Sequence, residues 1–200
     1  MLIVVSPAKA LDFDSPLATE KHSQPSMLKR SKELVGVLST KTPDDLRSLM
    51  SISDSLAELN FDRYQDWSTP FTTENSRPAI LTFSGDTYIG LDAGGKFNER
   101  DFTHAQKTLR ILSGLYGVLR PLDLIQPYRL EMGSKLETKS SKDLYGFWGS
   151  EITMKLNHDL LDSPGDSALV NLASNEYFKS VNPEEIKGKL VTPTFLDRKE

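Results

Sequence analysis

Two short runs of the sequence, Leu2–Val5 and Ala168–Leu172, are almost entirely apolar. A strand with one face in water alternates apolar and polar residues, so a continuous apolar run predicts a strand covered on both faces. The runs Ala79–Phe83, Pro127–Met132 and Leu190–Leu196 are also predicted to be strands. Helical patterns lie between these runs, and strands that alternate with helices predict a mixed α/β fold.

The helices are predicted from apolar spacing and from helix-start signals. Segment 42–45, with the sequence TPDD, has a capping side chain, a proline and two acids, which is typical of a helix start. A helix capped by Asn98 is expected to continue to Leu112, because apolar residues recur at helical spacing over that range. The other predicted helices cover 25–38 and 142–160, and one more begins near a capping box at 55–58.

The composition of the chain excludes several kinds of functional site. The chain has 200 residues and no cysteine, which excludes disulfides, thiolate metal sites and cysteine nucleophiles. The apolar run at the N-terminus is too short for a signal sequence or a membrane span, so we expect a cytoplasmic protein without a membrane partner. The three histidines lack metal-site spacing, and we predict no metal and no cofactor. The net charge is −4, although residues 100–145 carry more Lys and Arg than Asp and Glu.

The stretch 109–121 carries two glycines between apolar segments. In one interpretation it is a helix-hairpin-helix, whose backbone amides approach a phosphate closely because glycine has no Cβ. In the other interpretation the glycines only let the chain reverse. The candidate phosphate-binding residues of this turn and its flanks are Arg110, Ser113, Gly114, Gly117 and Arg120.

A second polar group follows the turn. On a strand from Tyr128, alternation places Arg129 and Glu131 on one face, where Arg120 and Asp123 would meet them. This group is either a ladder of exposed ion pairs, each contributing about 0–1 kcal/mol, or an anion pocket in which guanidinium groups hold phosphate or carboxylate.

Other polar residues follow predicted strands. Lys9 comes just after Leu2–Val5, and ligands of open α/β sheets bind at the carboxyl ends of strands. The segment around Lys9 has no P-loop glycines, so it does not predict a nucleotide. Asp86, Glu176 and Lys179 also follow strands, and convergence of these ends would place them in one cleft with Lys9.

Several motifs together resemble the YaaA family of bacterial peroxide-stress resistance proteins. The motifs are SPAK at 6–9, GDTYIGL at 85–91, LSGLYGVLRPLD at 112–123, PYRLEMG at 127–133 and NLASNEYFK at 171–179. The resemblance follows the chain in order over essentially all 200 residues.

This resemblance implies a cytosolic protein that limits reactive intracellular iron. It also implies one α/β unit unlike the common superfolds, a helix-hairpin-helix and a positively charged cleft that binds DNA. On this chain the hairpin maps to Leu112–Leu119, and Lys9, Arg120 and Arg129 fall at motif positions suited to cleft cations. Many relatives have threonine where this chain has Ala10. Relatives also continue past Glu200 with a basic segment, so we expect a single domain over 1–200 that lacks this part.

The favoured function is therefore a DNA-binding stress protein without a catalytic step, acting as a monomer. Phosphate contacts carry no base information, so binding is expected to be directed by DNA shape and sensitive to salt. The alternative is an enzyme that acts on a small anionic metabolite or a damaged nucleotide, because acids accompany the cations at the strand ends. Direct iron binding fits poorly, since no two-His-one-carboxylate spacing is visible.

Overall fold

The computed structural model describes residues 1–195 and confirms the α/β class. A five-stranded sheet has the strand order β6-β5-β1-β8-β9. These strands are β1 (Leu2–Val5), β5 (Leu109–Ser113), β6 (Gly117–Leu119), β8 (Ala168–Asn171) and β9 (Lys189–Val191). Strands β5, β1, β8 and β9 are parallel, whereas β6 pairs with β5 in the antiparallel direction. The sheet is therefore mixed, as expected.

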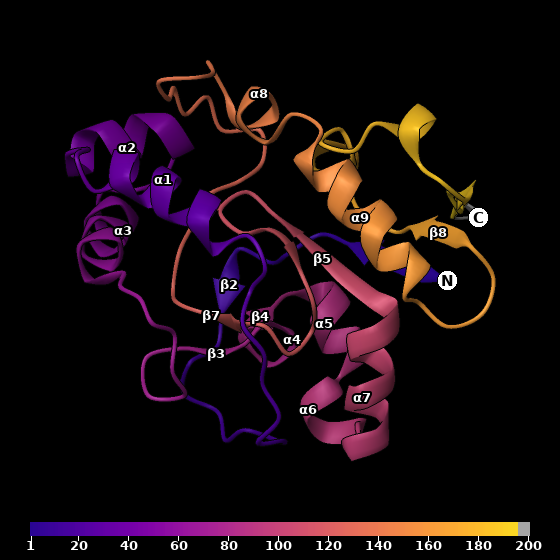
Figure 1. Cartoon of the computed structure of the whole chain (residues 1–200). Helices are drawn as coiled ribbons and strands as arrows, with labels where there is room; N and C mark the ends of the chain where they lie inside the picture. Colours follow the sequence, from indigo (N-terminus) through magenta and orange to yellow (C-terminus); the bar gives the residue numbers. More distant parts are fainter. Residues whose placement is uncertain (196–200) are drawn as a thin grey trace, which may run out of the picture.

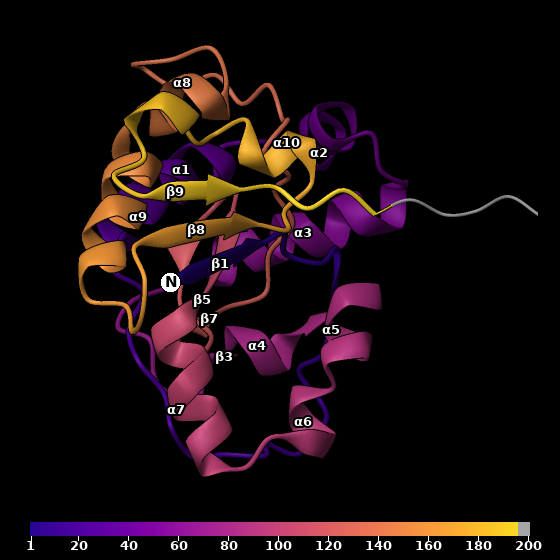
Figure 2. The same ribbon diagram turned by 90° about the vertical axis from the view of Figure 1, so that its right-hand side faces the viewer.

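The two apolar runs become neighbouring strands at the centre of this sheet. Strand β1 pairs with β5 on one side and with β8 on the other, with Val5 opposite Ile111 and Val4 opposite Asn171. Leu2 and Val4 are completely buried, because helices pack around the sheet. Figure 2 shows β1, β8 and β9 side by side, with their carboxyl ends at the same edge.

The helices fall into three groups around the sheet (Figure 1). Helices α1, α2 and α3 gather at one end, α4 to α7 lie together with the short strands, and α9 lies beside β8 with α8 above it at the top of the view. Their bounds are α1 Leu28–Leu38, α2 Pro43–Met50, α3 Asp54–Asp66, α4 Ala79–Thr82, α5 Asp86–Leu91, α6 Ala93–Lys96, α7 Glu99–Thr108, α8 Leu144–Trp148, α9 Glu151–Leu161, α10 Asn175–Phe178 and the 3-10 helix η1 Pro183–Glu185. Two short antiparallel pairs complete the fold: β2 (Ala10–Leu11) with β4 (Phe83–Ser84), and β3 (Arg77–Pro78) with β7 (Leu124–Ile125).

Two predicted helix starts, at Thr42 and Asn98, are accurate, whereas the helix predicted from residue 25 begins at Leu28 and the one placed at 55–58 is capped by Ser53. Thr42 accepts from the Asp45 amide and forms a capping box with it at the start of α2. Asn98 forms the same arrangement with Asp101 at the start of α7. The end of α7 was mispredicted, because the helix stops at Thr108 and the next five residues form β5. Pairing with β1 and β6 outweighs the helical spacing of the apolar side chains there.

The predicted helix-hairpin-helix is wrong. The segment is a tight β-hairpin in which Ser113 of β5 pairs with Gly117 of β6. Gly117 has a φ of +68°, the left-handed region that favours glycine. The pairs Leu112–Val118 and Ile111–Leu119 continue the ladder, so both arms of the turn are strands of the main sheet.

Three further predictions of elements need correction. The run Ala79–Phe83 forms α4 and the first residue of β4. The helix predicted for 142–160 is divided into α8 and α9 at Gly149, whose φ is +48°. The strand predicted for 190–196 is limited to β9, and its last residue lies outside the described residues.

The run Pro127–Met132 is irregular rather than a strand, because side chains bond its backbone and that of the residue before it. The Tyr64 hydroxyl donates to the carbonyl of Arg129. The Tyr116 hydroxyl accepts from the Gln126 amide at 3.1 Å and donates to the Gln126 carbonyl at 3.3 Å. Buried tyrosines thus supply bonds that a neighbouring strand would otherwise make.

Candidate functional site

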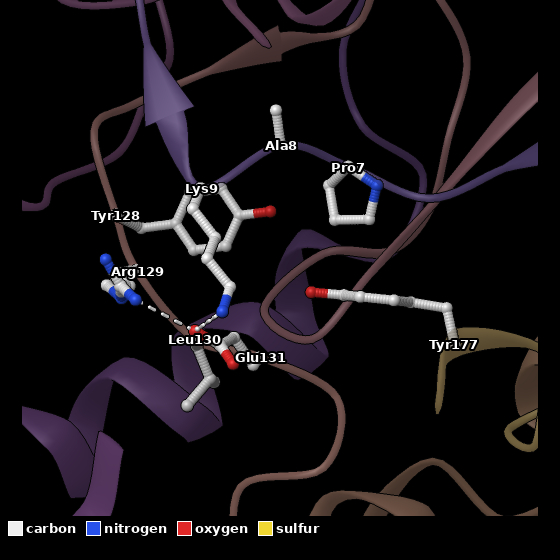
Figure 3. A pocket seen from close by; sticks show the side chains of 8 residues that line it. All are labelled: Pro7, Ala8, Lys9, Tyr128, Arg129, Leu130, Glu131 and Tyr177. Atoms are coloured by element: carbon white, nitrogen blue, oxygen red, sulfur yellow. Dashed lines mark hydrogen bonds and ion pairs between the residues drawn. The ribbon is translucent and has the colours of Figure 1, made fainter. Parts of the chain in front are cut away.

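A small pocket lies where the chain leaves the carboxyl end of β1 (Figure 3). Three segments form it: 7–9 after β1, 128–131 in the irregular stretch after β7, and α10 after β8. The position matches the edge at which open α/β sheets bind ligands. Its lining consists of Pro7, Ala8, Lys9, Tyr128, Arg129, Leu130, Glu131 and Tyr177.

Opposite charges meet on one carboxylate oxygen in this pocket. Oε1 of Glu131 lies 3.2 Å from Nζ of Lys9 and 3.1 Å from Nη2 of Arg129. The side chains differ in exposure: 65% for Lys9, 23% for Glu131 and 18% for Arg129. Figure 3 shows the ammonium and guanidinium groups converging on this carboxylate. The pocket therefore carries mixed charge rather than a purely positive surface.

Hydrogen bonds fix the position of the pocket wall. The buried hydroxyl of Tyr128 lies 2.7 Å from Oγ of Ser113, at the end of β5. The same Ser113 oxygen accepts from the amide of Tyr116 at 3.0 Å. Among the described residues, the buried Nε of Arg129 has no hydrogen-bond partner. The Nε–H group of this guanidinium is therefore a donor without an acceptor among the described residues.

Two tyrosines face the pocket from opposite sides (Figure 3). Burial raises the pKa of Tyr128 well above its ordinary value, and the nearby Tyr177 adds to the effect. Burial likewise raises the pKa of Tyr177, with a smaller contribution from the charge of Glu176. Both phenols stay protonated near neutral pH, so they act there as neutral hydrogen-bonding groups.

The pocket has very little free space. Its accessible volume is about 10 Å³, which is about what one water molecule needs. A ligand larger than water therefore requires a lining side chain to move.

Polar contacts join the two strand ends beside the pocket. Oγ of Ser6 accepts from the amide of Ser174 at 2.9 Å, which ties the segment after β1 to the segment after β8. Oε1 of Glu176 accepts from the amide of Gly133 at 2.8 Å and so anchors the chain beyond Glu131. Glu176 thus lies beside the pocket wall and holds it in place.

The remaining candidates at the strand ends lie outside the lining. Lys179 packs over the ring of Tyr145, with Nζ 4.9 Å from the ring centroid. Asp86 is exposed at the start of α5. The preceding Gly85 lies against Ala8, since an added Cβ would come 3.0 Å from the Ala8 Cβ. The predicted cleft is therefore reduced to Lys9, Arg129 and Glu131, with Glu176 as their neighbour.

The glycine turn faces the core rather than solvent. Ser113 is completely buried, as are the side chains of the two residues between the glycines. The Gly114 carbonyl accepts from Nε1 of Trp148 at 3.0 Å, and a Cβ on Gly114 would lie 2.3 Å from the Leu130 carbonyl oxygen. At Gly117, an added Cβ would lie 2.8 Å from Sδ of Met27. Close packing requires these glycines, which agrees with the interpretation that they serve chain reversal.

Arg110 is also a buried group. Its Nε donates to Oδ2 of Asp159 in α9 at 2.6 Å, and both side chains are 6% exposed. Oδ1 of Asp159 accepts from Lys155 at 2.5 Å, which adds a second cation. Arg110 therefore holds β5 against α9 and is not a surface cation.

Arg120 and Asp123 form a separate polar cluster at the other end of the sheet. Leu119 of β6 lies opposite Ile111 of β5, and β6 runs antiparallel, so the chain after β6 emerges near the start of β5. The Asp123 side chain is 1% exposed, and its Oδ1 accepts from Nη2 of Arg120 at 2.9 Å and from Oγ of Ser23 at 2.6 Å. These residues fix the loop that follows β6, and they are remote from the pocket.

Sequence reasoning missed the roles of Tyr64 and Tyr177. Tyr177 belongs to the segment 171–179 singled out above, but its neighbours Glu176 and Lys179 attracted attention because they are charged. Tyr64 lies on α3, far along the chain from Arg129, and its contact with that residue depends on tertiary structure.

Within residues 1–195, no group of three or more His, Asp or Glu side chains is arranged to hold a metal ion. None of the described helices is both long enough and apolar enough to cross a bilayer.

The mixed sheet and the mixed-charge pocket at the ends of its central strands define an α/β protein with a candidate oxyanion site. A sequence model for the family described as peroxide stress protein YaaA matches residues 1–200. The chain belongs to this family, so the resemblance deduced from the motifs is confirmed.

Proposed function

We propose that this peroxide-stress protein binds the oxyanion group of a small metabolite or a damaged nucleotide in the pocket around Glu131. The observation that carries the proposal is the convergence of Lys9 and Arg129 on a single carboxylate oxygen. An ammonium and a guanidinium aimed at one oxygen form an arrangement that recognises phosphate or carboxylate.

The surroundings of the two cations strengthen this recognition. The Arg129 side chain is 18% exposed, so water screens its charge less than it would on the open surface. The neutral phenol of Tyr177 supplies a hydrogen-bond donor beside the charges, whereas the Tyr128 hydroxyl is paired with Ser113 and its ring forms part of the wall. Small-ligand sites typically combine apolar walls with a few polar groups placed in this way.

Calorimetric titration with a nucleoside 5′-monophosphate tests the proposal. Arg129→Gln and Lys9→Gln should each weaken binding about tenfold or more, because hydrogen bonds to charged groups contribute about 1.5–3 kcal/mol. Lys135→Gln is the matched control, since it removes an exposed lysine outside the pocket lining. Equal affinity for all four proteins would reject the pocket as the binding site. Turnover of a bound metabolite, lost in Glu131→Gln, would extend the role from binding to catalysis.

DNA binding is the second candidate function, and the coil that leaves the pocket favours it. Lys135, Lys139 and Lys142 are exposed along this coil, and Lys9 stands at the pocket mouth with a 65% exposed side chain. Such cations would contact successive phosphates without reading bases, which predicts recognition of shape. This surface replaces the buried glycine turn as the proposed DNA contact.

Salt dependence tests the DNA candidate. Binding to a duplex with an unpaired region should weaken by an order of magnitude or more between about 50 and 200 mM salt if several phosphates are contacted. A variant with glutamine at 135, 139 and 142 should weaken DNA binding and leave binding of the monophosphate unchanged. A flat salt response would contradict DNA binding through this surface.

The resemblance also implies that the protein limits damage by intracellular iron, and we propose that binding in the pocket is needed for this protection in the cytoplasm. Cells that rely on the Arg129→Gln protein should be more sensitive to hydrogen peroxide than cells with the wild-type protein. A cell-permeant iron chelator should remove most of that difference. A difference that the chelator leaves untouched would separate the pocket from protection against iron damage.

A further inference from the structure

We propose that Glu131 is an internal substitute for the ligand, and that an oxyanion binds by displacing its carboxylate from Lys9 and Arg129. The inference rests on the proposed oxyanion site and adds how that site opens. The carboxylate occupies the position at which the two cations converge, 3.2 Å from one and 3.1 Å from the other.

Space is the first argument for displacement. The accessible volume of about 10 Å³ is about what one water molecule requires. A phosphate group is several times larger than water, so it does not fit beside Glu131 as the pocket stands. An incoming oxyanion must take the place of a lining group, and the carboxylate is the group that most resembles it chemically.

The donor capacity of Arg129 is the second argument. A guanidinium presents its donors as a fork that matches two oxygens of one ligand. Glu131 engages Nη2 in the ion pair, while the buried Nε has no hydrogen-bond partner among residues 1–195. A phosphate group has more acceptor oxygens than this carboxylate offers, so it satisfies the fork more completely once the carboxylate moves.

The third argument is that the displacement requires only side-chain movement. The Lys9 side chain is 65% exposed, so its ion pair with Glu131 is weak, and the incoming oxyanion replaces the more buried pair that Glu131 makes with Arg129. Backbone anchors hold the segment on both sides of Glu131, because the Leu130 carbonyl packs against Gly114 and the Gly133 amide is bonded to Glu176. Rotation of the Glu131 side chain therefore exchanges the carboxylate for the oxyanion while the wall of the pocket stays fixed.

The ligand chemistry that best replaces a carboxylate here is a terminal phosphate. A phosphomonoester carries close to two negative charges at neutral pH and three acceptor oxygens, whereas a backbone phosphodiester of DNA carries one charge. Two cations therefore attract the phosphomonoester more strongly than the phosphodiester. Three probes distinguish a terminal phosphate from a backbone phosphodiester: inorganic phosphate, a nucleoside 5′-monophosphate and a short DNA without terminal phosphate.

The test measures binding of these three probes to wild type, Glu131→Gln and Glu137→Gln by calorimetry. Glu131→Gln removes the competing charge and should tighten binding of the monophosphate about tenfold or more. Glu137→Gln is the matched control, because it removes the same charge from an exposed residue of the same segment that lies outside the pocket lining. This control should change affinity by less than about threefold.

The remaining outcomes separate the two proposals. Wild-type binding that depends on Lys9 and Arg129 but is equally affected by Glu131→Gln and Glu137→Gln would overturn displacement and leave the oxyanion site intact. Failure of wild type and Glu131→Gln to bind any of the three probes would overturn both. A larger gain in affinity for the DNA than for the monophosphate, on going from wild type to Glu131→Gln, would overturn the assignment of a terminal phosphate. Circular dichroism and thermal unfolding verify that each variant is folded.

Discussion

The hydroxyl of Tyr128 lies 2.7 Å from Oγ of Ser113, and both side chains are at most 5% exposed. This contact joins the last residue of β5 to the wall of the pocket. Ser113 was expected to hold a phosphate on the surface of a turn. It acts instead behind the pocket, where it positions a tyrosine that lines the site.

Ser113→Ala should therefore destabilise the protein. The change leaves the buried hydroxyl of Tyr128 and the amide of Tyr116 without their shared partner, and each unsatisfied buried group costs about 1–3 kcal/mol. Urea unfolding measures the loss. Ser26→Ala, at an exposed serine, is the control and should change the free energy of unfolding by less than about 0.5 kcal/mol. Similar stability for the two variants would contradict the buried role of Ser113.

Gly114→Ala should be destabilising by about 1–3 kcal/mol or more, because the new Cβ would lie 2.3 Å from the Leu130 carbonyl oxygen. The backbone of Leu130 must shift, and the adjacent pocket wall shifts with it. Gly36→Ala is the control: it lies within α1, where an added Cβ meets nothing within 4 Å. That change should stabilise the protein by up to about 1 kcal/mol. Thermal unfolding of the pair compares the two glycines directly.

Asp159→Asn should cost about 3–5 kcal/mol in the free energy of unfolding, because it leaves the buried guanidinium of Arg110 without its counter-charge. Burial by itself raises the pKa of Asp159, but the hydrogen bond from Lys155 and the charge of Arg110 bring it below the ordinary 3.8. A carboxyl whose pKa is lowered by folding stabilises the fold above its unfolded pKa and loses that contribution as the pH falls through its folded pKa.

Wild-type stability should therefore decline below about pH 4, and Asp159→Asn should show a shallower decline over the same range. Urea unfolding between pH 7 and pH 3 provides the measurement. Parallel pH curves for the two proteins would show that the Asp159 carboxyl does not contribute as proposed.

Tyr177→Phe should weaken binding of a nucleoside 5′-monophosphate by up to about tenfold, since it removes a neutral donor from the pocket. Tyr145→Phe is the control, because that hydroxyl donates to the Glu176 carbonyl and lies outside the pocket lining. Calorimetry compares both variants with wild type. A larger loss in the Tyr145 variant than in the Tyr177 variant would place the ligand elsewhere.

The sequence predicted the centre of the fold well, because burial leaves a local signal. The continuous apolar runs became β1 and β8, and the caps at Thr42 and Asn98 start α2 and α7. Long-range pairing was not visible. The apolar residues of 109–113 continue the helical spacing of the preceding segment, yet these residues form β5 because they pair with β1 and β6.

The site was predicted in part. Lys9, Arg129 and Glu131 converge on one carboxylate oxygen. They could be named from the sequence because a lysine after a buried strand and alternating charges in 128–132 are local signals. The error concerning Arg110 and Arg120 arose because each has a buried acid as its partner. Asp159 is distant in sequence, and the burial of Asp123 depends on packing that no local pattern encodes.

The most direct test of the oxyanion site is an NMR titration of the isotope-labelled protein with a nucleoside 5′-monophosphate. The largest amide shifts should fall on Ala8, Lys9, Leu130, Glu131 and Tyr177, and Arg129→Gln should abolish them. Shifts that cluster away from these residues, or that persist unchanged in Arg129→Gln, would contradict the pocket as the site of recognition.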